Sequence, residues 1–382
     1  MVNVDEYEEL MKPIMIVNRI ISVWPVEEND NSILSRMRIF HRILLFTLLI
    51  VQAIAVTAEI VHHWGDMKEV TECALITTAF YLSILRLIVY TIHDRDLQIS
   101  VKTMKEDWTK YSGDDELALK EKCLPILKIA KMFIMTVGST ILLFMMAPIL
   151  EVKLLGMEEK KLPFRGFFFS NQTNSPAYQG FYVLGVIVGA FGGSTIAGAT
   201  TLNLILVMHG SAKFLVVRRN IENLKSDKHS SITFTDCVKR HQEAILFAER
   251  VENTINVLVL GQFVISTGLV CFAGFQITEM TKDRGQLMKY TSFLNSAIFE
   301  LFLFSYSGQE LLTESNAVGE SCYASNWVGA GFTKSMQIVM IRSLYPCKIT
   351  AAKFYDMSLA NFSSILSSSF SYLTVLRTME VE

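Results

Sequence analysis

The sequence predicts an all-α membrane protein with seven transmembrane helices. Of its 382 residues, 51% are hydrophobic and 19% are charged, and the hydrophobic residues are gathered into segments rather than spread evenly. A helix that crosses a bilayer needs about 20 largely apolar residues. Seven segments meet this requirement, namely residues 40–61, 73–92, 126–150, 180–208, 255–278, 288–308 and 354–377.

The segment before the first span, residues 1–39, begins with an acidic stretch that includes Asp5 and Glu6. A signal peptide begins with basic residues followed by an apolar run, so the first span is expected to insert as its own anchor. The loops on the side of the N-terminus carry 21 Lys and Arg residues, and those on the opposite side carry 8. Because basic loops stay in the cytoplasm, we expect a cytoplasmic N-terminus and an extracellular C-terminus.

The longest loop on the expected outer side covers residues 151–179. It is rich in phenylalanine, contains Pro163 and Pro176, and is expected to fold over the outer mouth of the bundle. A glycosylation sequon begins at Asn171 in the same loop. Its position agrees with the predicted orientation.

The cytoplasmic segments are longer and predict helices below the membrane. Apolar residues recur at helical spacing in residues 230–254 and in residues 309–327, so these segments are expected to prolong the fifth and sixth spans. We expect a cytoplasmic helix over residues 209–254 and anchor helices over residues 309–348. Such helices need partners for their apolar faces, which favours an intracellular assembly domain.

The last span carries one stripe of mostly small polar side chains along a helix, at alternating steps of three and four. Its members are Asn361, Ser364, Ser368, Ser371, Val375 and Thr378. A small polar stripe with one β-branched residue suits a water-filled path with a hydrophobic constriction. Serines also line close helix contacts in membranes, so the stripe by itself leaves both interpretations open.

The chain shows no motif for catalysis or for a metal. It contains no HExxH, GxSxG or GxxxxGKS/T motif, and its six cysteines form no CxxC pair. We therefore predict no enzyme activity, no cofactor, no metal and no nucleic-acid partner. Arg86 and Glu300 lie inside spans, where ionisable groups are usually paired, and we expect them to be structural.

Two C-terminal blocks resemble a known family. The stretch from Met340 to Met379 resembles the C-terminal signature of insect odorant receptors, and the block from Gly308 to Trp327 is similar to the segment before it. One departure is Ala352, where the family commonly has glycine. The matching signature positions are Arg342, Pro346, Lys348, Thr350, Ala351, Lys353, Phe354, Leu359, Phe362, Ile365, Leu366, Ser369, Ser371, Tyr372, Thr374 and Leu376.

The resemblance implies a ligand-tuned subunit, because the chain lacks the extended loop after the fourth span of the family's co-receptor. Such subunits form ligand-gated, non-selective cation channels, usually tetramers with the co-receptor, in the plasma membrane of sensory dendrites. The last helix of each subunit would line the pore, within residues 349–382, and residues 40–308 would form the ligand-binding bundle. Aligned with the family, the gate falls on Val375 and Met379, with Thr378 beside them, on the C-terminal side of the pore-lining residues Ser364, Ser368 and Ser371.

The resemblance also places the odorant pocket between the second, third, fourth and sixth spans, with a contribution from the fifth. Aromatic and Met walls with few charges suit a small, largely neutral, volatile organic molecule. Each residue named for the pocket is equally compatible with ordinary helix packing. They are Thr77, Phe80, Tyr81, Ser139, Leu143, Met146, Phe181, Tyr182, Gly185, Val188, Phe275, Thr291 and Asn295.

Two other receptor classes remain as alternatives. A G-protein-coupled receptor also has seven spans, but its N-terminus is outside, and this chain has no NPxxY motif in its last span. A gustatory-type receptor channel is closer in mechanism and differs in its C-terminal signature. The side of the membrane on which the N-terminus lies separates the first alternative from our prediction.

Overall fold

The structure, a computed structural model, describes residues 4–25, 32–154, 161–167, 176–224, 233–280 and 283–381. Within these ranges the chain is almost entirely helical. Its elements are α1 (Val4–Ile20), α2 (Ser32–His62), α3 (Met67–Ile92), α4 (Asp94–Lys110), α5 (Asp114–Leu154), α6 (Ala177–Glu222), α7 (Phe234–Glu279), α8 (Arg284–Ala324), α9 (Thr333–Ser343), β1 (Thr350–Ala351), β2 (Tyr355–Asp356) and α10 (Leu359–Val381).

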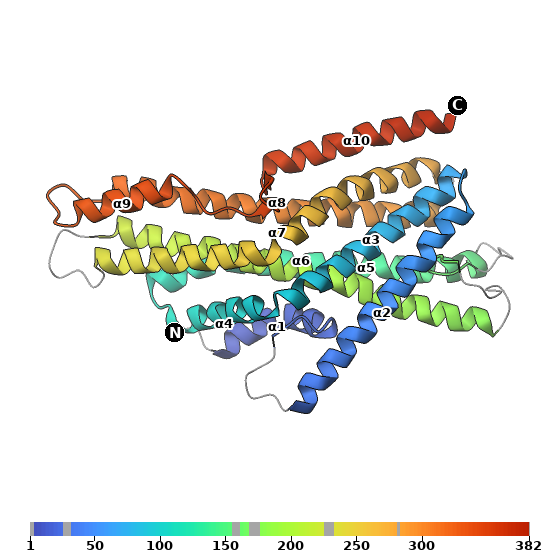
Figure 1. Cartoon of the computed structure of the whole chain (residues 1–382), viewed down its shortest axis with the longest axis horizontal. Coiled ribbons are helices and arrows are strands. Elements are labelled where there is room, and N and C mark those ends of the chain that lie inside the picture. The colour runs from blue at the N-terminus through green and yellow to red at the C-terminus, as the bar shows by residue number, and fades with distance from the viewer. Residues whose placement is uncertain are drawn as a thin grey trace.

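Four long helices, α5 to α8, run along the long axis of the molecule (Figure 1). Helices α2 and α3 pack against each other at one end of this bundle, and α10 lies along α7 and α8. Helices α1 and α4 lie together on the other side of the bundle, against α6. Helix α6 contacts every other long helix of the bundle, and its residues from Thr195 to Val217 are nearly all buried. A helix that is apolar all round takes such a central place.

The expected spans correspond to helices, with one shifted boundary. The first six lie within α2, α3, α5, α6, α7 and α8, respectively. The seventh, expected over residues 354–377, begins in the β1–β2 hairpin, and α10 starts only at Leu359. In the described part of the chain, five helices are long and apolar enough to cross a membrane, in α2, α3, α5, α6 and α7. Helices α8 and α10 have the length for a span but are not among these five.

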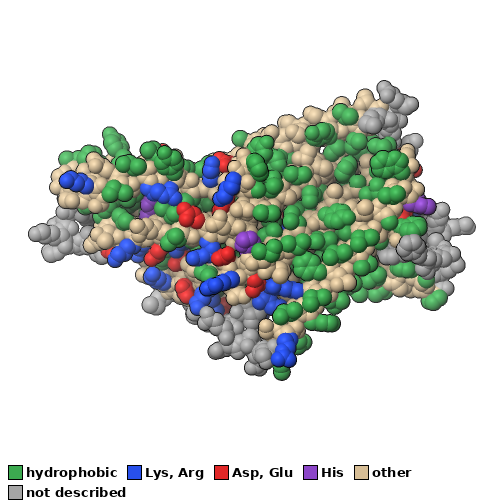
Figure 2. Space-filling model, in the orientation of Figure 1, with side chains coloured by type: hydrophobic (Ala, Val, Ile, Leu, Met, Phe, Trp, Pro, Cys, Tyr) green, Lys and Arg blue, Asp and Glu red, His purple; other side chains and the backbone are tan. Residues whose placement is uncertain are grey.

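Charged and apolar side chains occupy different halves of the surface (Figure 2). Lys, Arg, Asp and Glu gather over the half that holds α4 and α9, whereas apolar side chains cover the half that holds α2, α3 and α10. Large apolar residues such as Ile54, Met135, Leu142 and Val264 are exposed there. A continuous apolar surface of this extent is a membrane-facing surface.

The helical extensions differ from expectation in one respect. Helix α7 is unbroken from Phe234 to Glu279, and α8 is unbroken from Arg284 to Ala324, so the predicted extensions of the fifth and sixth spans are present. The segment 209–254, expected as one helix, instead comprises the end of α6 and the start of α7. Helix α7 begins with a capping box between Thr233 and Asp236.

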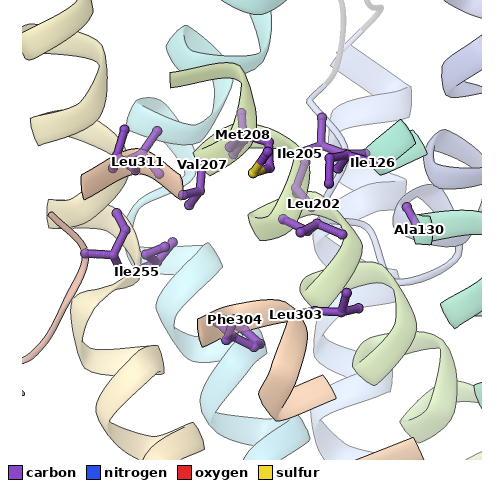
Figure 3. Close-up of a cluster of buried hydrophobic side chains, with 14 of the residues drawn as sticks. Ile126, Ala130, Leu202, Ile205, Val207, Met208, Ile255, Leu303, Phe304 and Leu311 are labelled. Carbon is purple, nitrogen blue, oxygen red and sulfur yellow. The ribbon is translucent and has the colours of Figure 1, made fainter. Parts of the chain in front are cut away.

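An apolar core lies at the centre of the described part of the chain, and Figure 3 shows some of its members. It brings together side chains from α5, α6, α7 and α8, which interdigitate at the centre of the bundle. Its labelled members are Ile126, Ala130, Leu202, Ile205, Val207, Met208, Ile255, Leu303, Phe304 and Leu311. All are nearly inaccessible to solvent, so this part of the bundle is closed.

Candidate functional site

A cavity lies in the apolar half, between α3, α5, α6, α7 and α8. Its empty space is about 790 Å³, part of which is open to the exterior. The lining residues are Ile76, Ala79, Phe80, Leu82, Ser83, Val137, Thr140, Ile141, Phe144, Phe164, Gly189, Gly192, Gly193, Ile196, Leu269, Phe293, Ser296, Ala297 and Glu300.

Phenylalanines form one end of this cavity. Phe164 stacks on Phe144, with ring centroids 5.7 Å apart and planes at 11°, and meets the edge of Phe80 at 5.8 Å. Phe293 packs against Phe144 at 6.0 Å. A Cβ atom at Gly189 would lie 2.2 Å from the Phe164 ring, so a glycine lets the loop side chain approach α6. This end favours flat or compact apolar groups.

Phe164 comes from residues 161–167, a loop segment that is held against α2 and α3. Arg165 forms ion pairs with Glu69 and with Glu72, the second at 3.4 Å. Its carbonyl accepts a hydrogen bond of 3.1 Å from the Gln52 side chain, and the Phe167 N–H donates to the Ala55 carbonyl at 2.9 Å. The described part of the long loop therefore closes the aromatic end of the cavity.

The other end of the cavity is polar. Glu300 on α8 lines it and pairs with Arg86 on α3, with 2.5 Å between Oε1 and Nη2. Thr200 on α6 donates to the same carboxylate oxygen at 2.5 Å, and Gln262 on α7 donates to Oε2 at 3.2 Å. Arg86 and Glu300, which were expected to be structural, pair with each other, and this cluster joins four helices at the base of the cavity.

Phe80 is the one residue of the thirteen named for the pocket that lines this cavity. Three other candidates precede a lining residue by one position, namely Ser139, Leu143 and Asn295. One position along a helix turns the side chain by about 100°, so these side chains point in a different direction from the lining residues. Tyr81 is 45% exposed and its hydroxyl lies 3.2 Å from that of Thr57, towards α2.

The remaining eight pocket candidates lie in three settings. Thr77, Val188 and Phe275 are buried but do not line the cavity, and Met146 and Thr291 are exposed. Phe181, Tyr182 and Gly185 are near the start of α6, where the Tyr182 hydroxyl donates to the Met145 carbonyl and Gly185 faces Pro163. Leu143 and Phe181 are partly buried.

Helix α10 packs on the bundle through one face and leaves the serine stripe exposed. Ile365 and Ser369 are buried against the bundle, Leu373 contacts Gly274 of α7, and the Phe362 ring lies 5.8 Å from that of Phe302 on α8. Ser364, Ser368, Ser371, Val375 and Thr378 are all exposed on a different face. The side chain of Met379 and the predicted glycosylation site Asn171 lie outside the described residues.

The hairpin before α10 fixes where this helix starts. Thr350 donates to the Glu252 carboxylate on α7 at 2.5 Å, and Lys353 pairs with it at 2.7 Å. Ala352 has φ +46°, in the left-handed region that favours glycine. The backbone of this turn would therefore accommodate a glycine without strain.

The family described as 7tm Odorant receptor matches residues 66–370. Odorant receptor 13a of Drosophila melanogaster is 22% identical and covers 98% of this chain and 96% of that protein. Odorant receptor 82a of the same species is 24% identical, over 84% of this chain and 87% of that protein.

Solved structures show the same fold. The structure of the insect olfactory receptor OR5 from Machilis hrabei in complex with eugenol superposes with a TM-score of 0.84 at 16% identity, over 98% of this chain and 100% of that chain. The structure of OR5 described without eugenol gives a TM-score of 0.80, over 98% of each chain. The prediction of an all-α membrane protein of this receptor type is confirmed.

Proposed function

Because the chain belongs to the insect odorant receptor family, we propose that it is the ligand-binding subunit of a ligand-gated, non-selective cation channel. It is a multi-pass membrane receptor and not an enzyme. The observation that carries the proposal is the cavity of aromatic and aliphatic residues that is closed by Phe164. A small, largely neutral volatile molecule is the ligand that such walls accommodate. The presence of eugenol in the OR5 complex is consistent with this use of the fold.

Helix α8 connects the proposed pocket to the proposed pore. Phe293 and Glu300 on α8 line the cavity, and Phe302 on the same helix contacts Phe362 of α10. A ligand that displaces α8 would therefore move a helix that is packed directly on α10. We infer that this contact transmits binding to a gate formed by Val375 and Met379 in a pore lined by α10.

We further propose assembly into a tetramer with the co-receptor in the plasma membrane. The region around α9 exposes a cluster of large apolar side chains at the end of the molecule away from the membrane-facing surface. Four of them are Ile338, Ile341, Leu344 and Tyr345. Clusters of exposed apolar side chains are a common feature of sites of protein association. Membrane lipid would surround the apolar half, and cations would permeate along α10.

We expect an N-terminal epitope tag to be stained only after cells are permeabilised, and a C-terminal tag to be stained in intact cells. The physical reason is the excess of basic residues in the loops on the side of the N-terminus. Immunofluorescence of doubly tagged receptor provides the measurement. Staining of the N-terminal tag in intact cells would reverse the topology and favour a G-protein-coupled receptor.

We expect Phe144→Ala to change the order of responses across a panel of volatile compounds. The change removes one wall of the aromatic end, so ligands that pack on it should lose about tenfold or more in sensitivity, while smaller ones lose little. Whole-cell recording with the co-receptor gives the dose-response curves, and a co-receptor agonist reports surface expression.

Met135→Ala is the matched control, because Met135 lies on the same helix and is exposed on the membrane-facing surface. It should leave the order of responses unchanged. If both variants shift the responses equally, or neither does, the cavity is not the ligand site.

A further inference from the structure

Glu300 is the residue with a formal charge among the described residues that line the cavity. Its side chain is almost fully buried, at the opposite end from the phenylalanine cluster. An ionised carboxylate at this depth is costly and requires partners. The hydrogen bonds that these partners donate to the two carboxylate oxygens determine which further hydrogen bond a ligand can make to Glu300.

The carboxylate retains capacity for one further donor. A carboxylate accepts about four hydrogen bonds, two on each oxygen. In the described part of the chain, Oε1 accepts from Arg86 and Thr200, whereas Oε2 accepts from Gln262 alone. The Gln262 amide is itself held by the Ser266 hydroxyl at 2.9 Å, which fixes its orientation.

We propose that the cavity recognises the hydroxyl group of a neutral alcohol or phenol, which donates a hydrogen bond to the Glu300 carboxylate. This inference rests on the proposed function, since it assumes that the cavity holds the ligand. It assigns Glu300 a role in binding as well as in structure.

The charge and the hydrogen-bond capacity of the site disfavour two other classes of ligand, namely ammonium compounds and molecules whose oxygen carries no proton. Arg86 already neutralises Glu300, so an ammonium ligand would add an uncompensated charge to an apolar site. The oxygen of an ether, an ester or a ketone has no proton and would face a carboxylate that cannot donate. The Arg86 Nε and Nη1 atoms have no partner among the described residues, and Arg86 is not among the residues that line the cavity.

The dimensions of the site limit the rest of the ligand. Phe293 at the aromatic end and Glu300 at the polar end lie two turns apart on α8, roughly 10 Å. Between them the wall is aliphatic, with Ile76, Ile141 and Leu269. The site therefore fits a hydroxyl group attached to an aromatic ring or to a medium-length hydrocarbon chain.

The test compares each alcohol or phenol with its methyl ether, which keeps the body and removes the donated proton. The probes are 2-phenylethanol, 1-octanol and 4-methylphenol, each beside its methyl ether, in whole-cell recordings of the receptor with the co-receptor. We expect each hydroxyl compound to act at a concentration about 10- to 100-fold lower than its methyl ether. This is the difference expected when a hydrogen bond to a charged group is lost. Equal potency, or greater potency of the ethers, would overturn the inference.

A double variant links this preference to Glu300. Arg86→Met/Glu300→Leu replaces the buried pair with apolar side chains of similar size, which preserves packing better than loss of one partner. We expect it to lose the preference for the hydroxyl compounds while it still responds to the ethers. A preference retained in the double variant would show that another group reads the hydroxyl.

The comparison of alcohols with ethers in the unaltered receptor needs no variant. Equal potency there overturns the inference even where the double variant fails to reach the cell surface. The proposed function fails separately. If Phe144→Ala leaves every sensitivity unchanged, the cavity is not the ligand site. If Phe144→Ala shifts the sensitivities but alcohols and ethers act equally, only the inference about Glu300 fails.

Discussion

Replacement of Gly308 by valine is expected to abolish ligand-evoked current while the ligand cavity is retained. A Cβ atom at Gly308 would lie 2.5 Å from the Met357 carbonyl oxygen and 2.7 Å from its Cβ atom. Backbone atoms cannot give way as the end of a flexible side chain can, and the overpacking costs about 1–3 kcal/mol or more. Met357 lies between the hairpin and α10, so relief of the clash must displace the start of α10 from α8.

The measurement is current in response to an activating volatile, together with surface labelling of a tagged receptor. Gly138→Val is the matched control, because a Cβ atom at Gly138, also in a long helix, meets nothing within 4 Å in the described structure. The control should conduct normally. Normal current from Gly308→Val would show that the contact between α8 and Met357 does not matter for gating.

Hydropathy located the helices because a bilayer requires long apolar segments whose backbone groups are satisfied internally. It did not locate the start of the last helix. The expected span included Phe354 and Tyr355, which are apolar, yet these residues belong to the hairpin that is anchored on Glu252 of α7. That anchor depends on a residue about 100 positions away, so no local pattern reveals it.

For the candidate pocket, the sequence indicated the helices but not which side of each helix faces the cavity. The helices that line the cavity were largely those expected, but residues such as Ser139 and Asn295 point one helical step away from it. In a membrane protein the lipid-facing side of a helix is as apolar as the interior, so periodicity does not identify the inner face. The signals that did mark the inside were Arg86 and Glu300, because a charge in a span must face a partner.

Small residues were a second signal that the sequence offered. Gly189, Gly192 and Gly193 all line the cavity, and a side chain at Gly193 would collide with Ile141. The absence of side chains there creates the space that the aromatic residues border. Gly185 and Gly189 are spaced as in a GxxxG motif, which indicates close packing in a membrane helix. The close partner of Gly189 is a loop side chain, Phe164.

The second large effect is expected at the proposed gate. Val375→Ser should raise ligand-independent current or change ion permeability. Val375 is 55% exposed and lies on the same face of α10 as Ser368 and Ser371, away from the contacts with α7. Around a narrow pore, a ring of such side chains excludes water when the channel is closed, and a hydroxyl group in its place lets water enter.

The control residue must lie outside the serine stripe and must not contribute to the packing of α10 on the bundle. Leu373 is unsuitable because it packs on Gly274, whereas Phe370 is 56% exposed on the other open face of the helix. Recordings of Val375→Ser and Phe370→Ser, each with the co-receptor, give leak current and reversal potentials under mixed cations. When three of the four subunits are co-receptors, the change affects one side of the ring, so a partial effect is expected. An equal or larger change in permeability from Phe370→Ser would place the pore on the other face of α10.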